Sequence, residues 1–216
     1  MKPFTPDDLI ACYRRGVFPM AESRDEQGVF LVDPEWRCVL PLDRFHVSRR
    51  LARTIRAERF RFSVDSDFAA VMDACAAPGP DRDDTWINAD IRALYLELHR
   101  RGLAHCVEAW SGEDLVGGLY GVSLGGAFFG ESMFSRASDA SKAALVHLVA
   151  RLRVGGFRLL DAQFLTPHLE QFGAAALPRD IFHKVLGAAL GASGDFSAME
   201  ETTSGAQLLQ SVAQRS

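Results

Sequence analysis

Three extended segments joined by two short glycine turns constrain the fold of this chain most. The segments are residues 105–110, 115–124 and 127–134, and the turns are Ser-Gly-Glu at 111–113 and Gly-Gly at 125–126. Turns this short reverse the chain between neighbouring antiparallel strands. The sequence therefore predicts a three-stranded antiparallel meander.

Segments with apolar side chains at helical spacing surround this meander. The helices are expected to start at Thr5, Ser48, Asp65 or Ser66, Asn88, Ser138, Thr166 and Pro178, mostly residues that cap a helix N-terminus. Extended segments are also expected at residues 29–40, 62–64 and 158–164. Helices beside a mainly antiparallel sheet indicate an α+β fold.

The pattern changes near Arg61, which predicts a small N-terminal domain over residues 1–61 and a larger domain over 62–190. Residues 191–216 read as a polar C-terminal tail. Leu208, Leu209 and Val212 could form a short docked helix there, but a frayed end is the expectation for a chain terminus.

Composition narrows the class of protein. No apolar run reaches the roughly 20 residues that span a bilayer, and the first eight residues carry two acids where a signal peptide has an apolar core. We therefore expect a cytoplasmic protein with no membrane contact, and a monomer by default. Cys12, Cys38, Cys75 and Cys106 form no CxxC pair, so we expect reduced thiols in the core, and no spacing predicts a metal site.

The net charge of −4 does not indicate a nucleic-acid-binding protein, but the charges are unevenly distributed. The predicted helix after Ser48 carries Arg49, Arg50, Arg53 and Arg56, with Glu58 the one acid between residues 44 and 61. Such a helix is either a solvated charged face or a phosphate-binding surface.

Three polar side chains could carry chemistry. Asp161 and Gln163 lie two residues apart on a predicted strand, so they share a face. They are either the solvated side of an edge strand or a hydrogen-bonded pair in which Asp161 orients Gln163. Glu131 lies among aromatic residues and needs a partner if buried: Arg136 or Lys142 in a structural role, or a substrate amine in a functional one.

In order along the chain, the motifs YRRGVFP (13–19), TWI (85–87), LVGGLYGV (115–122), GESMFSR (130–136) and DAQ (161–163) resemble the bacterial leucyl/phenylalanyl-tRNA–protein transferases. The resemblance runs from about Leu9 to about Leu190. It implies a GNAT-like acyltransferase fold for the larger domain and no cofactor. It also implies transfer of Leu or Phe, with Met as a third candidate, from aminoacyl-tRNA to an N-terminal Arg or Lys, which marks the acceptor for degradation.

The resemblance also assigns roles to residues. Asp161 and Gln163 match the family's proposed catalytic pair, Glu131 belongs to its active site, and the arginines of the helix after Ser48 are the candidates for tRNA binding. The residues expected to hold the Leu or Phe side chain, each also explicable as ordinary core, are Trp86, Leu119, Phe128, Met133, Leu148 and Leu152.

One departure from the family pattern concerns the donor site. Many members carry two tryptophans before the proline that matches Pro34, where this chain has Leu31 and Val32. Phe30 or Trp36 could take over their contacts.

Two other functions are alternatives to this transfer. An acyl-CoA-dependent GNAT-type acyltransferase needs a pyrophosphate loop between a strand and a helix, and residues 153–156 instead end a predicted helix. A non-catalytic RNA-binding module would use the arginine helix and leave Glu131, Asp161 and Gln163 without a role.

Overall fold

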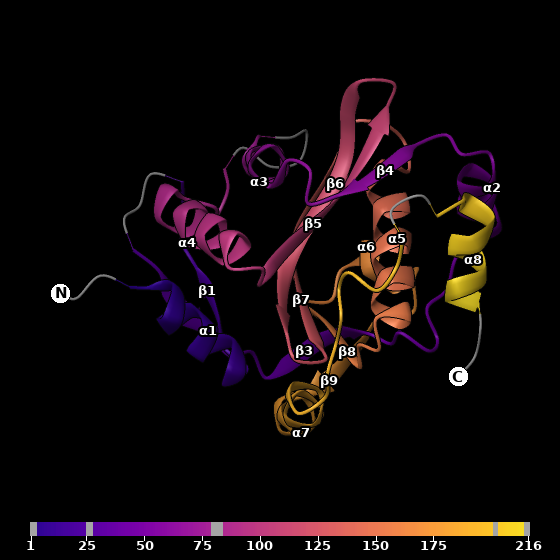
Figure 1. Cartoon of the computed structure of the whole chain (residues 1–216). Coiled ribbons are helices and arrows are strands. Elements are labelled where there is room, and N and C mark those ends of the chain that lie inside the picture. Colours follow the sequence, from indigo (N-terminus) through magenta and orange to yellow (C-terminus); the bar gives the residue numbers. More distant parts are fainter. Residues whose placement is uncertain (1–3, 25–27, 79–83, 201–202, 214–216) are drawn as a thin grey trace.

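The computed structural model describes residues 4–24, 28–78, 84–200 and 203–213. A seven-stranded sheet runs through the middle of the molecule, with helices on both faces (Figure 1). Its strands, in spatial order, are β4 (Arg61–Val64), β5 (Ala104–Ser111), β6 (Asp114–Leu124), β7 (Ala127–Ser135), β8 (Leu159–Gln163), β3 (Trp36–Leu40) and β9 (Ala175–Pro178). A separate two-stranded sheet pairs β1 (Phe18–Met20) with β2 (Phe30–Val32).

The predicted meander is present as β5, β6 and β7, which pair antiparallel in sequence order. The other neighbours are antiparallel too, except that β7 and β8 run parallel. Parallel neighbours need a crossover connection, and the helix α5 (Ala140–Val154) supplies it. The sequence-based prediction of an α+β fold is confirmed.

Two groups of helices cover the sheet and make two apolar cores (Figure 1). On one face α5 packs against β5, β6 and β7, with α2 (Arg49–Arg56) and α8 (Gly205–Ala213) against α5 and the short α6 (Pro167–Glu170) nearby. The other face carries α1 (Pro6–Arg14), α3 (Phe68–Ala76), α4 (Ala89–Arg100) and α7 (Arg179–Leu190). In the described residues no helix is long and apolar enough to cross a bilayer.

Predicted helix caps agree with the structure at four places. The side chains of Thr5, Ser48, Asn88 and Thr166 each accept a hydrogen bond from the backbone N–H three residues ahead. The helix predicted to open at Ser138 begins at Ala140, after Asp139 in a left-handed conformation with φ of 69°.

The expectation of a frayed C-terminal end is wrong for residues 205–213. They form α8, whose Leu208, Leu209 and Val212 are buried against α5 and α2. A helix this short is held by tertiary packing more than by its own propensity, and its partners lie far away in the sequence. The four cysteines are buried thiols, as predicted.

The domain division at residue 61 stays a prediction. β3 and α2 both precede that boundary, yet β3 pairs with β8 inside the seven-stranded sheet and α2 packs on α5.

Candidate active site

The candidate catalytic residues lie where two parallel strands separate. The pairing of β7 with β8 ends at Phe129 and Asp161, although β7 continues to Ser135 and β8 to Gln163. A hollow of about 290 Å³ opens beyond that point, and Glu131, Asp161 and Gln163 all line it. The structure therefore brings the three predicted polar residues together.

Glu131 is held by two tyrosine hydroxyls. Tyr13 Oη on α1 donates to Glu131 Oε1 at 2.6 Å, and Tyr95 Oη on α4 donates to Oε2 at 2.8 Å. The two hydroxyl oxygens also lie within hydrogen-bonding distance of each other, and both tyrosines are fully buried. The structural alternative of a pair with Arg136 or Lys142 is wrong, because Arg136 donates to the Leu115 carbonyl and Lys142 pairs with Asp139.

The environment moves the Glu131 carboxyl toward neutral pH. Burial raises its pKa from 4.5 to about 7, and the negative charge of Asp161 acts in the same direction. The hydrogen bonds from Tyr13 and Tyr95 and the charge of Arg37 oppose the rise. Burial beside Glu131 also raises the pKa of both tyrosines well above 10, so they remain hydrogen-bond donors. Glu131 can consequently accept or release a proton near pH 7.

Asp161 is completely buried and has two partners. Arg37 donates to both of its oxygens, from Nε at 2.8 Å and from Nη2 at 2.6 Å. Gln163 donates to Oδ1 from its backbone N–H at 3.0 Å and to Oδ2 from its side-chain amide at 3.5 Å. The predicted contact between Asp161 and Gln163 is therefore present, and the reading of this pair as a solvated strand edge is wrong.

Gln163 has a φ of 55°, in the left-handed region that non-glycine residues seldom occupy. This conformation ends β8 and interrupts the alternation of side chains along the strand. Asp161, which accepts the Gln163 backbone N–H, helps to hold the residue in this conformation.

Apolar side chains make up most of the hollow. Of the residues predicted to hold the donor side chain, Leu119, Met133 and Leu148 line it, together with Leu145, Leu160 and Leu169. Trp86 instead lines a small adjoining hollow of about 70 Å³, which also contacts Glu131, Gln163 and Phe164. Phe128 and Leu152 are buried, but neither is among the described residues that line either hollow.

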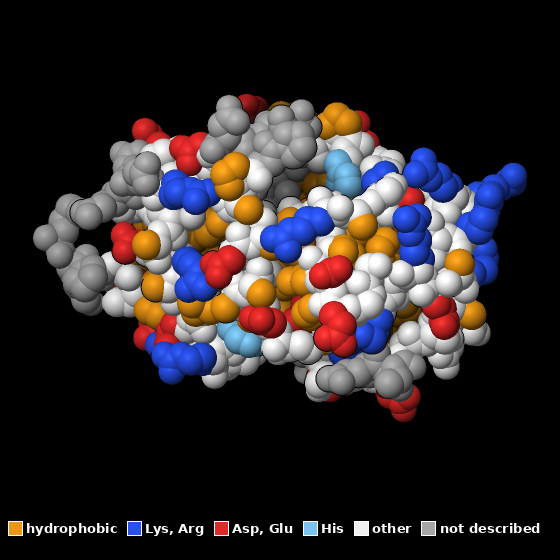
Figure 2. Space-filling model, turned by 90° about the horizontal axis from the view of Figure 1, so that it is seen from above, with side chains coloured by type: hydrophobic (Ala, Val, Ile, Leu, Met, Phe, Trp, Pro, Cys, Tyr) orange, Lys and Arg blue, Asp and Glu red, His pale blue; other side chains and the backbone are white. Residues whose placement is uncertain are grey.

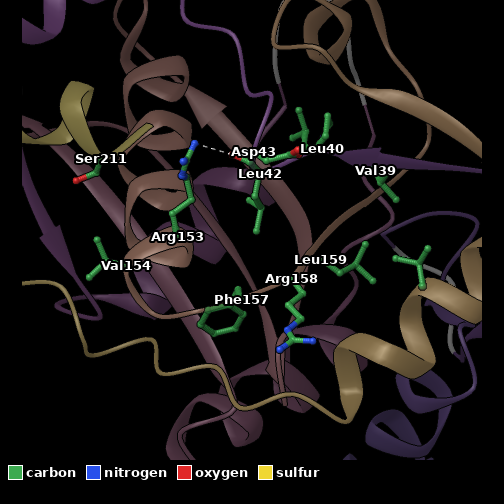
Figure 3. Close-up of a pocket in the computed structure, with 12 residues that line it drawn as sticks. Val39, Leu40, Leu42, Asp43, Arg153, Val154, Phe157, Arg158, Leu159 and Ser211 are labelled. Carbon is green, nitrogen blue, oxygen red and sulfur yellow. Dashed lines mark hydrogen bonds between the residues drawn. The ribbon is translucent and has the colours of Figure 1, made fainter. Parts of the chain in front are cut away.

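A second, larger hollow of about 620 Å³ lies elsewhere, between the end of β3, the C-terminal end of α5 and the start of β8 (Figure 3). Leu42, Arg153, Phe157 and Arg158 are among its lining residues, and Arg153 donates to the Leu42 carbonyl at 3.0 Å. None of the described residues around it is a candidate catalytic residue. The hollow of about 290 Å³ is therefore the candidate active site, although it is smaller than this one.

The predicted arginine surface lies at the end of the molecule that carries α2 (Figure 2). Arg49, Arg50, Arg53 and Arg56 are exposed, while Leu51 and Ile55 are buried against the core. Arg50 lies 3.5 Å from Asp139 and donates to Ser138 at 3.4 Å. These two residues lie in the short segment between β7, which carries Glu131, and α5, so Arg50 contacts the chain shortly after that strand.

Sequence reasoning missed three residues of the site: Arg37, Tyr13 and Tyr95. Tyr13 opens one of the motifs quoted above, but nothing in the motif shows that its hydroxyl meets a carboxylate 118 residues away. Arg37 carried a signal that could have been used, because it is a charged residue inside the otherwise apolar strand β3.

The part of the chain that the structure describes has no group of three His, Cys, Asp or Glu side chains suited to a metal ion. Fold and site together define an α+β protein with a buried acid–amide pair and a carboxyl of raised pKa beside an apolar hollow.

Comparison with known proteins identifies the family. Residues 39–187 match the model of the leucyl/phenylalanyl-tRNA protein transferase, and residues 3–35 match that of its N-terminal domain. Proteins named leucyl/phenylalanyl-tRNA–protein transferase are 62% identical in Phenylobacterium zucineum, over 92% of this chain and 90% of the relative, and 55% identical in Maricaulis maris, over the whole of both chains. The chain belongs to the leucyl/phenylalanyl-tRNA–protein transferase family, and it matches both the main model of that family and the model of its N-terminal domain.

A third relative, from Caulobacter vibrioides, is 58% identical over 99% of this chain and 98% of its own. Among solved structures, L-PGS from Bacillus licheniformis aligns with a TM-score of 0.45 at 12% identity, covering 86% of this chain and 76% of that one.

Proposed function

We propose that this protein transfers Leu or Phe, with Met as a third candidate, from aminoacyl-tRNA to the N-terminal amine of proteins that begin with Arg or Lys. The observation that carries the proposal is the meeting of Glu131, Asp161 and Gln163 at one apolar hollow. Similarity to relatives named for this transfer, over nearly the full chain, supports it. The product would mark the acceptor for degradation in the cytoplasm, and the protein would act as a monomer.

The hollow fits the side chain of the donor amino acid. Leu119, Met133 and Leu148 offer apolar contact, and the unbranched Met133 can adapt to an aliphatic or an aromatic group. Phe128 and Leu152 would support this wall from the core behind it. Trp86, beside Glu131 in the adjoining small hollow, would contact the donor next to its reacting ester.

The reaction joins an amine to an ester carbonyl. The acceptor amine arrives partly as an ammonium, because its pKa is roughly 7.7–8.0. Glu131, with a pKa of about 7, would accept one proton from it. The nitrogen then forms the new C–N bond, the C–O bond to the ribose breaks, and the ribose oxygen leaves with a proton that the nitrogen loses.

Asp161 and Gln163 would align the reactants. An amide is too weak a base to take the proton, but the side chain of Gln163, held by Asp161, can hydrogen-bond to the amine or to the ester carbonyl. The ester is already activated, so alignment of two bound substrates can supply on the order of 7–11 kcal/mol. This chemistry calls on no metal or cofactor.

The tRNA would lie along α2. Arg49, Arg50, Arg53 and Arg56 are exposed and can neutralise phosphates without reading sequence. Recognition confined to the acceptor end would fit a basic surface of this size in a chain with a net charge of −4.

The test is transfer of radiolabelled leucine from leucyl-tRNA to a peptide that begins with Arg, beside a matched peptide that begins with Ala. We expect label on the Arg peptide and background on the Ala peptide. Label on neither, with acyl transfer from acyl-CoA instead, would replace the proposal with the acyl-CoA-dependent function.

A further inference from the structure

Arg37 holds a central position without reaching either hollow of the site. Its side chain is 1% exposed, and it is not among the described residues that line the two hollows. The guanidinium forms the bidentate contact with Asp161, and its Nη1 donates to the Gly16 carbonyl at 3.2 Å. Any effect of Arg37 on the reaction must therefore come from the residues that it holds or from its charge.

We propose that Arg37 is a positioning residue that holds two parts of the active site in place relative to each other: the Asp161–Gln163 pair and the contact of Tyr13 with Glu131. The inference rests on the functions proposed above for Glu131, Asp161 and Gln163. One arm of the guanidinium fixes Asp161, and through it Gln163. The other fixes the end of α1, which carries the tyrosine that binds Glu131.

The hydrogen bond from Arg37 to the Gly16 carbonyl affects Tyr13, because Gly16 and Tyr13 lie close together. The Gly16 N–H donates to the Tyr13 carbonyl at 3.0 Å, so both residues belong to the turn that ends α1. Gly16 has a φ of 79°, and a Cβ there would lie 2.8 Å from the ring of His183, so the turn packs closely against that ring on α7. A shift of the Gly16 carbonyl would consequently move Tyr13 relative to Glu131.

Aromatic rings hold the guanidinium itself in place. Its Cζ lies 4.3 Å from the centre of the Phe18 ring on β1 and 4.7 Å from that of the Phe182 ring on α7. Stacking of this kind suits the flat guanidinium and not the ammonium of lysine. Arg37 is thus tied to β1, β8, α7 and the end of α1.

The same charge acts on Glu131. The charge of Arg37 lowers the pKa of the Glu131 carboxyl, so its loss would raise that pKa further. The titratable groups that act on Glu131 come from four elements: Tyr13 of α1, Tyr95 of α4, Asp161 of β8 and Arg37 of β3. Tyr120 of β6 and His168 of α6 line the same hollow. Arg37 is the one cation among the described groups that act on Glu131.

The experiment compares Arg37→Lys, which keeps the positive charge but loses the planar guanidinium and its bidentate contact, with Arg37→Met, which loses the charge as well. Arg151→Lys is the matched control, because Arg151 is also buried and stacked on an aromatic ring, Phe196, but lies outside the site. Leucine transfer to an Arg peptide is measured per folded protein, with the folded fraction taken from circular dichroism.

We expect Arg37→Lys to lower kcat by on the order of 10²-fold, the cost of a misplacement of about 1 Å. The KM for leucyl-tRNA should stay within about twofold, and Arg151→Lys should keep the wild-type kcat. In Arg37→Met the midpoint of the pH–rate profile should move to higher pH, whereas in Arg37→Lys it should stay in place. A role in folding alone would change neither kcat per folded protein nor that midpoint.

An Arg37→Lys protein with the wild-type kcat would overturn the inference, provided that Glu131→Gln and Gln163→Ala lose activity in the same assay. If those two variants are also fully active, the proposed function of the site fails, and the inference about Arg37 fails with it. The two failures are therefore distinguishable.

Discussion

Replacing Tyr95 with Phe tests how the tyrosine pair controls the Glu131 carboxyl. Tyr95→Phe removes the hydrogen bond of 2.8 Å to Oε2 and leaves the bond of 2.6 Å from Tyr13 to Oε1. The lost bond favours the ionised carboxylate, so its removal raises the pKa of Glu131 above its value of about 7. The ring keeps its packing, because only the hydroxyl is lost.

The size of the shift follows from the strength of the bond. A hydrogen bond to a charged group contributes about 1.5–3 kcal/mol, and one pKa unit corresponds to 1.36 kcal/mol, so the bond is worth about one to two units. Because Tyr13 still donates a hydrogen bond and compensates in part, we expect the pKa of Glu131 to rise by about one unit. The ionised fraction of Glu131 at pH 7 then falls from about one half to about one tenth.

The assay is the rate of leucine transfer to an Arg peptide between pH 6 and 9, for the wild type and Tyr95→Phe. The acceptor amine titrates identically in both, so the ratio of the two rates isolates the enzyme. We expect the variant to be about fivefold slower at pH 7 and to approach the wild type at pH 9. A ratio that does not change with pH would refute the role of Glu131 as the proton acceptor.

Three further predictions concern the apolar hollow, the arginine helix and the C-terminal helix. Leu148→Ala should cost about 2–5 kcal/mol of stability and shift the ratio of kcat/KM toward the larger phenylalanyl donor. Leu152→Ala, one turn along α5 and outside the lining, should cost stability without changing that ratio; equal ratios in both variants would contradict the assignment. Arg53→Glu should raise the KM for tRNA and reduce the slope of log affinity against log salt by about one, whereas Arg100→Glu on α4 should leave both unchanged. Leu208→Ala, buried in α8, should lower the urea midpoint by an amount equivalent to about 2–5 kcal/mol, which a frayed end would not show.

Local signals in the sequence were sufficient for the elements that local chemistry determines. Glycine turns define β5, β6 and β7, and hydroxyl or amide caps define the starts of α1, α2 and α4. The strands β1 and β9 were not predicted, because each is short and contains a proline, Pro19 or Pro178, a residue that is depleted in strands. Their pairing with β2 and β3 is visible only in the folded chain.

The residues of the site were likewise predictable only where the sequence carried a local signal. Glu131, Asp161 and Gln163 were found as polar residues in apolar or extended segments, and all three line the hollow. Leu148 and Leu152 could not be told apart, because α5 is buried nearly all around and has no hydrophobic stripe that would show which side faces the hollow.

Arg37 and the tyrosines were missed for a different reason. The contacts that give Tyr13, Tyr95 and Arg37 their roles span 118, 36 and 124 residues of sequence, and only the folded chain brings these residues together.

The most direct test of the account is the single-turnover rate of leucine transfer to an Arg peptide in Glu131→Gln, with leucyl-tRNA bound at saturation. Glutamine keeps the size of the side chain, and its carbonyl oxygen can still accept a hydrogen bond from one of the two tyrosines while its NH2 group donates to the other hydroxyl oxygen, but it cannot take a proton. We expect tRNA affinity within about twofold of the wild type and a transfer rate lower by about 10²–10⁴-fold, the usual contribution of a positioned acid or base. A transfer rate equal to that of the wild type at pH 7 would contradict the account and place the proton acceptor elsewhere.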